Sequence, residues 1–146
     1  MREMQSIAAV ATAIISFAAA FHFHWAFGGR RGFAVSLPQR PDGEPVLRHL
    51  LHLWRPAALL VALGLVVLGA LVAAKAVPLD HGLDPRLLDL LLLGAGIAFV
   101  ARSIVPNRYV GFFKRLRSTR WARYDTRLYS PLFLMLGLCL ILVARS

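Results

Sequence analysis

Four long apolar segments, separated by stretches that carry most of the charge, dominate the hydrophobic pattern of the chain. They run from about residue 6 to 27, 57 to 74, 85 to 105 and 128 to 144. The second segment has 18 residues and no charge, and as a helix it would be about 27 Å long, close to the ~30 Å hydrocarbon thickness of a bilayer. A surface helix of a soluble protein would show one polar face, which these segments lack. The pattern therefore predicts an all-α fold, an integral membrane four-helix bundle forming a single domain.

Residues that favour helix ends stand at the borders of these segments. Gly28 and Gly29 follow the first segment, where glycine releases a helix into a turn. Pro56 precedes the second, and Asp84 with Pro85 forms a good N-cap and first-turn pair for the third. The first segment begins like a signal peptide, but its apolar run continues past the small residues where cleavage would occur. We therefore expect a retained helix.

Charge indicates how the helices are oriented. The chain is 58% hydrophobic with a mean hydropathy of +0.64, yet its net charge is +10. Residues 28–56 carry five arginines against two carboxylates, and residues 106–127 carry six arginines and a lysine against one, whereas the connection around Asp80 and His81 is neutral. The positive-inside rule places both basic loops in the cytoplasm and both termini outside. These arginines are expected to meet membrane lipids, including anionic headgroups, which leaves nucleic acid a poor partner.

The two halves of the chain have a faint likeness. Each has an apolar segment, a basic loop and then an aromatic-x-Pro entry into a leucine-rich segment, as in Trp54-Arg55-Pro56 and Tyr129-Ser130-Pro131. Two parallel-repeat helical hairpins would produce this pattern. Membrane entrances also collect aromatic residues for their own reasons, so both explanations stay open.

Both cytoplasmic loops contain stretches with helical spacing of apolar residues. In the second loop the spacing joins Tyr109, Phe112, Phe113 and Leu116, and in the first it joins Leu47, Leu50, Leu51 and Trp54. Lys114 and Arg115 would lie opposite the apolar face of the second stretch. Such amphipathic interfacial segments are typical of helices that lie in the membrane surface, with aromatics inserted and cations on lipid phosphates.

Histidine is rare inside a membrane span and suggests function. His22 and Trp25 share a helical face with small residues, so His22 is expected to point into the bundle. His24 would point about 200° away, so the two histidines cannot chelate one ion. Cys139 is the only cysteine, which excludes an internal disulfide and a paired-cysteine zinc site. No metal or cofactor is predicted, although a haem shared between protomers through His22 is an alternative.

Several polar residues fall on one membrane face in this topology. Arg102, near the end of the third span, can reach lipid phosphates or pair with Asp125. The candidate binding residues are His22, Trp25, Arg102, Asn107, Arg108, Tyr109, Lys114, Arg115 and Asp125. A phosphate loop, a zinc spacing and a hydrolase triad are all absent from the sequence, so no catalytic residue is predicted.

Two hypotheses of function follow. The first is a non-catalytic membrane component that binds lipid, a small amphiphile or a partner protein, including a second copy of the chain, at its cytoplasmic face. The alternative is a membrane enzyme acting on a lipid or isoprenoid through a His/Arg/Asp site. Convergence of His22, Arg102 and Asp125 around one cavity would favour an enzyme or a binding site, and their dispersal would leave anchoring and scaffolding.

Four stretches together resemble a known family. They are His24-Trp25-Ala26-Phe27-Gly28-Gly29, Pro38-Gln39 with Asp42-Gly43, Asn107-Arg108-Tyr109-Val110-Gly111-Phe112-Phe113-Lys114-Arg115, and Asp125-Thr126-Arg127-Leu128-Tyr129-Ser130-Pro131. They resemble the small bacterial four-helix membrane proteins catalogued as domain of unknown function 3995. The resemblance implies the four-helix architecture and a bacterial plasma membrane, and it implies no reaction.

Overall fold

The computed structural model describes residues 2–77 and 82–146, and this part of the chain is helical without a β-strand. Four helical segments are long and apolar enough to cross a membrane: Arg2–Ala26, Arg48–Ala76, Pro85–Ile104 and Arg120–Ala144. The predicted all-α membrane fold is confirmed. Asp80 and His81, which were expected in the outer connection, lie outside the described residues.

The helices begin and end at residues with clear local causes. The long helices are α1 (Arg2–Ala26), α2 (Trp54–Ala76), α3 (Pro85–Ile104) and α5 (Ser130–Ala144). At the start of α3, Oδ1 of Asp84 accepts from the backbone N–H of Arg86 at 2.8 Å, with Pro85 in the first turn, as the sequence predicts. Gly28, at φ +93°, ends α1.

The last membrane helix begins earlier than the sequence predicts. A short helix α4 (Arg120–Tyr124) and a π-helical turn (Asp125–Tyr129) precede α5 without a break. Oγ1 of Thr119 caps α4 by accepting from the backbone N–H of Ala122 at 3.1 Å. The apolar run predicted from about Leu128 to Ala144 coincides closely with α5, and the two helical turns before it carry arginines and therefore give no apolar signal.

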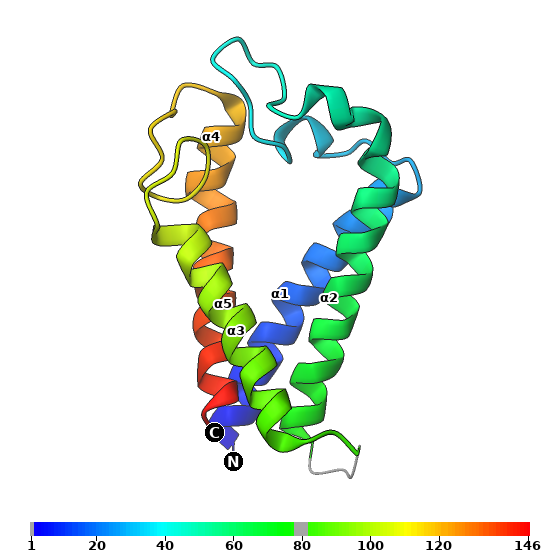
Figure 1. The fold of residues 1–146 in the computed structure, drawn as a ribbon, viewed down its shortest axis with the longest axis vertical. Helices are drawn as coiled ribbons and strands as arrows, with labels where there is room; N and C mark the ends of the chain where they lie inside the picture. The colour runs from blue at the N-terminus through cyan, green and yellow to red at the C-terminus, as the bar shows by residue number, and fades with distance from the viewer. Residues whose placement is uncertain (1, 78–81) are drawn as a thin grey trace.

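Figure 1 shows the helices arranged as two antiparallel hairpins, α1 with α2 and α3 with α5. The hairpins meet at the end where both termini lie, which we call the termini end, and separate toward the opposite end. That opposite end, the loop end, carries residues 27–53 and 105–119. The buried core occupies the termini half of the bundle and includes Ala11, Val72, Leu92 and Leu140.

Two close contacts hold the termini half together. A Cβ on Gly96 would lie 2.8 Å from the carbonyl oxygen of Gly137, and one on Gly137 would lie 2.7 Å from that of Gly96. The backbones of α3 and α5 therefore touch, as small residues allow in membrane helices. Between the hairpins, Nζ of Lys75 in α2 lies 2.6 Å from Oδ1 of Asp89 in α3.

The second basic loop differs from the sequence prediction. Residues 105–119 contain no helix, so the helical face expected for Tyr109, Phe112, Phe113 and Leu116 is wrong. The loop instead folds back on itself, with backbone hydrogen bonds of 3.0 Å from Arg115 N–H to Asn107 and from Leu116 N–H to Arg108. In the first loop, residues Arg48–Leu53 form a 3-10 helix that leads into α2. The expected helical character is present there.

Candidate functional site

A buried carboxylate organises the loop end of the second hairpin. The Asp125 side chain has no solvent exposure, and its Oδ1 lies 2.6 Å from Nη2 of Arg102, the second of the two alternatives expected for this arginine. Its Oδ2 accepts from Nζ of Lys114 at 3.0 Å, from the backbone N–H of Gly111 at 2.9 Å and from the Ser130 hydroxyl at 3.2 Å. These five residues form what we call the Asp125 cluster.

The π-helical turn brings two members of the cluster together. In an α-helix, residues five apart point about 140° away from each other. The i→i+5 turn, closed by the backbone N–H of Ser130 donating to the carbonyl of Asp125, sets both side chains on the same face. The carbonyl of Ser130 in turn accepts from the Ser103 hydroxyl at 3.2 Å, which ties α3 to the start of α5.

The loop enters the cluster at a glycine. Gly111 has φ +85°, and a Cβ there would lie 2.8 Å from the carbonyl oxygen of Ser103. That carbonyl also accepts from the backbone N–H of Phe112 at 2.8 Å. Only a residue without a side chain can bring its own N–H to Asp125 at this point.

The Asp125 cluster is saturated. Lys114, with its side chain 1% exposed, donates to Asp125, to the Gly111 carbonyl at 2.8 Å and to Oγ1 of Thr126 at 2.6 Å, which uses all three of its protons. Among the described residues, every buried side-chain nitrogen and oxygen has a partner. A carboxylate held by four donors has no position left for substrate. The cluster is therefore suited to holding structure and not to proton transfer.

The remaining loop candidates serve the loop's own architecture. Oδ1 of Asn107 accepts from the backbone N–H of Tyr109 at 2.9 Å, and the guanidinium of Arg108 lies 5.4 Å from the Tyr109 ring centre. The Tyr109 carbonyl accepts from Nε1 of Trp121 in α4 at 2.9 Å. Arg115 is exposed.

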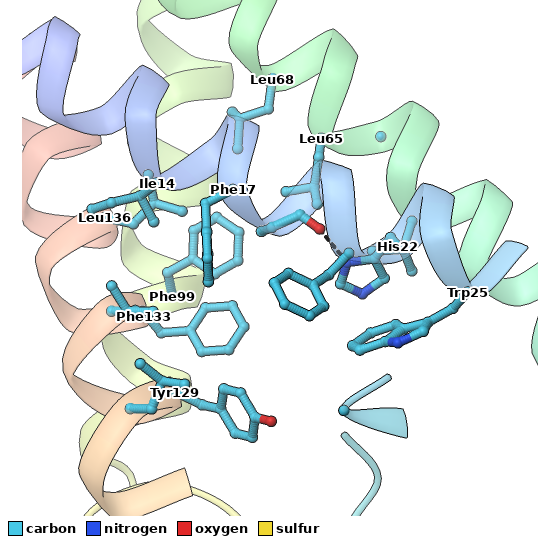
Figure 2. Close-up of a pocket in the computed structure, with 17 residues that line it drawn as sticks. Ile14, Phe17, His22, Trp25, Leu65, Leu68, Phe99, Tyr129, Phe133 and Leu136 are labelled. Atoms are coloured by element: carbon cyan, nitrogen blue, oxygen red, sulfur yellow. Dashed lines mark hydrogen bonds between the residues drawn. The ribbon is translucent and has the colours of Figure 1, made fainter. Parts of the chain in front are cut away.

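A second feature, which the sequence did not predict, lies between the hairpins. A cavity of about 450 Å³ opens there, bounded by α1, α2 and the last membrane helix, with Phe99 contributed by α3 (Figure 2). Its walls are apolar, and six aromatic side chains contribute to them: Phe17, Phe21, Trp25, Phe99, Tyr129 and Phe133. A repeat of aromatics on one face of α1, at Phe17, Phe21 and Trp25, was the available signal for this cavity.

Three polar side chains line the cavity, and each has a defined hydrogen bond. Nδ1 of His22 lies 2.8 Å from the carbonyl oxygen of Ala18. Nε1 of Trp25 donates to the Arg31 carbonyl at 2.9 Å, and the Tyr129 hydroxyl donates to the Val35 carbonyl at 3.0 Å. The inward orientation expected for His22 is confirmed.

His24 points elsewhere, as expected. It is exposed, does not line the cavity and occupies the space beside Gly29.

The first loop covers the loop end of the cavity. Gly32 lines the cavity, and Phe33 contacts Trp54 of α2 with ring centres 4.7 Å apart. Oε1 of Gln39 accepts from the backbone N–H of Trp121 at 3.0 Å. The loop thus bridges the first hairpin to the second.

The structure does not bring His22 and Asp125 together. His22 and Trp25 line the cavity, while Arg102 and Asp125 do not. The guanidinium of Arg102 lies 4.4 Å from the ring centre of Phe133, which does line the cavity. The convergence required for a combined His/Arg/Asp site is therefore missing. Within residues 2–77 and 82–146, no group of three or more His, Cys, Asp or Glu could hold a metal ion.

These features define a class of protein: a multi-pass membrane protein whose two helical hairpins share a core at one end and enclose an apolar cavity toward the other. Residues 15–140 match the family model described as protein of unknown function, DUF3995, and the chain belongs to this family. Comparison with curated proteins and with solved structures found no match.

Proposed function

We propose that this protein is a non-catalytic component of the bacterial plasma membrane that binds a lipid-like amphiphile in the cavity between its two hairpins. The observation that carries the proposal is the cavity itself, whose volume of about 450 Å³ falls within the ~300–1,000 Å³ common for small-molecule sites. Its saturated neighbour, the Asp125 cluster, supports a binding role over catalysis because it offers no free acid, base or nucleophile.

Hydrocarbon is the natural occupant of this space. An ordered water needs two to four polar partners, and the cavity walls carry few polar groups. An empty cavity would forfeit dispersion contacts along every wall. Two lining residues, Phe17 and Val61, are 51% and 45% exposed at positions well inside their helices, and we propose that an apolar molecule enters sideways from the bilayer beside them.

Filling the cavity from one wall tests the proposal. Gly64 of α2 lines the cavity, and a Cβ built there meets nothing within 4 Å, so Gly64→Phe can occupy the space without a backbone clash. Gly94 of α3 also has open space at its Cβ but does not line the cavity, which makes Gly94→Phe the matched control.

Native mass spectrometry of the purified proteins would measure the bound lipid. We expect wild type and Gly94→Phe to retain the same amphiphile at near-stoichiometric level, and Gly64→Phe to lose it while keeping the helical circular dichroism of wild type. Equal retention by both variants, or no retained amphiphile in wild type, would refute the proposed function.

We further propose that the loop end faces the cytoplasm, with its exposed arginines on anionic headgroups. The charge of the two loops supports this orientation. A Ser118→Cys variant should react with a membrane-impermeant maleimide only after spheroplasts are lysed, whereas Ser146→Cys should react in intact spheroplasts. Labelling of Ser118→Cys in intact spheroplasts would contradict the orientation. A second copy of the chain or another membrane protein as partner stays a prediction.

A further inference from the structure

The hydrogen-bonding state of His22 determines what it can offer to a ligand. A carbonyl oxygen only accepts hydrogen bonds, so Nδ1 of His22 must carry the proton in its 2.8 Å contact with Ala18. In a neutral imidazole the other nitrogen, Nε2, is then an acceptor. Among the described residues, no hydrogen bond to Nε2 is formed. Figure 2 shows the ring directed toward the cavity.

The second polar group that lines the cavity, the Tyr129 hydroxyl, is also a hydrogen-bond acceptor. The Tyr129 hydroxyl uses its only proton on the carbonyl of Val35, so its oxygen can only accept. The third, Trp25, uses its only side-chain N–H on Arg31. The side chains that line the cavity therefore present acceptors and no free donor.

The absence of charged side chains from the described part of the cavity lining restricts the ligand to neutral molecules. None of the described side chains that line the cavity is a lysine, arginine, aspartate or glutamate. The guanidinium of Arg102, which lies 4.4 Å from the ring centre of the lining residue Phe133, is paired with Asp125 and does not itself line the cavity. A phosphate or carboxylate in the cavity would face acceptors without a compensating cation, which is costly in an apolar space.

The place of His22 along the cavity sets the orientation of the ligand. Ile14 lines the deep part of the cavity, eight residues before His22 in α1, which is about 12 Å along the helix. Aliphatic residues line the deep part, where Leu136 lies beside Ile14 and Leu68 is contributed by α2 (Figure 2). A chain can therefore lie toward the termini end while a polar group lies at His22.

We propose that the cavity takes a neutral, hydroxyl-bearing amphiphile whose O–H donates to Nε2 of His22. This inference rests on the proposed function and adds the chemistry of the ligand's polar end. Long-chain and isoprenoid alcohols belong to this class, and phospholipids and fatty acids do not.

The test uses three probes of equal chain length with the full-length protein in detergent micelles. Hexadecanol has the required O–H, fluorohexadecane replaces it with a group of similar size that cannot donate, and hexadecanoate replaces it with an anion. Native mass spectrometry gives the bound fraction of each probe for wild type, His22→Phe and His24→Phe. The His22→Phe variant keeps an aromatic ring against Trp25, and His24→Phe makes the same change on the face that does not line the cavity.

We expect the alcohol-to-fluoride binding ratio of wild type and His24→Phe to be about threefold to tenfold higher than that of His22→Phe, the factor that one hydrogen bond provides. Fluorohexadecane should still bind to His22→Phe. Because each ratio is taken within one variant and compared across variants, differences in how the probes partition into micelles cancel.

The outcomes separate this inference from the proposed function. An alcohol-to-fluoride ratio in wild type that is no higher than in His22→Phe, or tightest binding of hexadecanoate by wild type, would each overturn the hydroxyl assignment while leaving a lipid-binding cavity. Failure of all three probes to bind wild type would overturn both.

Discussion

Replacing Asp125 with asparagine should expose how much the loop end depends on one buried charge. The substitution keeps the size of the side chain but removes its negative charge and turns one oxygen into an NH2 group. Either orientation of the amide sets a donor against a donor, because Arg102 occupies one oxygen and three donors occupy the other. Lys114, at 1% exposure, cannot turn to water to recover its hydration.

The expected loss of stability follows from burial. Removing one partner of a buried ion pair leaves an uncompensated charge and costs about 3–5 kcal/mol. Asp89 provides the matched comparison, because its pair with Lys75 has the same 2.6 Å separation but side-chain exposures of 39% and 17%. Water can hydrate that lysine when its partner is lost, so Asp89→Asn should cost only about 0.2–1 kcal/mol.

Unfolding of the purified variants by sodium dodecyl sulfate titration, followed by far-ultraviolet circular dichroism, gives the free energies to compare. The double variant Asp125→Asn with Lys114→Met should be more stable than Asp125→Asn alone, because it removes the stranded cation. A loss of stability in Asp125→Asn no larger than in Asp89→Asn, or a failure of the added Lys114→Met to recover stability, would show that the buried charge does not hold the loop end.

Three further predictions concern single contacts, and the same titration measures each of them. Gly111→Ala should be more destabilising than Gly43→Ala. Both glycines have φ +85°, which costs any other residue about 1–2 kcal/mol, but only a Cβ on Gly111 would also press against a carbonyl oxygen. Equal losses of stability would contradict this. Gly137→Ala should lower the stability by about 1–3 kcal/mol because it forces α3 and α5 apart, whereas Gly94→Ala, where the added Cβ meets open space, should be neutral or slightly stabilising. A neutral Gly137→Ala would show that the two helices can separate freely. Tyr129→Phe should lower the stability by about 0.5–1.5 kcal/mol and speed proteolysis of the first loop, because it removes a hydrogen bond that holds this loop to the second hairpin. Unchanged proteolysis would indicate that other contacts fix the loop.

The membrane helices could be predicted from sequence because their signals are local. An uninterrupted apolar run needs no knowledge of its neighbours to indicate a span, and the Asp84-Pro85 pair marks the start of α3 by itself. The inward face of α1 was equally accessible, since the spacing of small residues places His22 toward the bundle. The pairing of Arg102 with Asp125 could be anticipated as one option, because both charges fall at the same membrane depth.

The second loop shows where a local pattern fails. Tyr109, Phe112 and Phe113 have helical spacing, but the conformation of the loop is determined by Lys114 and Gly111, which are not part of this apolar pattern. Lys114 and the backbone of Gly111 both bind Asp125, and a helix through this stretch would have to give up that arrangement. A buried charge that needs several donors outweighs helical amphipathicity worth a few tenths of a kcal/mol per pair. Spacing along the chain carries no information about a partner more than ten residues away.

The aromatic repeat on α1 does not by itself indicate that the hairpins stay apart, and the reason for their separation also explains how the cavity can persist. In water, two apolar hairpins would close on each other to bury their faces, but in a bilayer lipid tails solvate these faces as well as another helix does. The distance between the hairpins is then decided by short backbone contacts and polar links. At the termini end, α1 packs into a shared core and Lys75 meets Asp89, whereas at the loop end the Asp125 cluster fixes the second hairpin and the first loop bridges the gap. Close packing at the termini end and polar contacts at the loop end together keep an apolar space between the two hairpins. Hydrocarbon can fill this space at little cost in free energy.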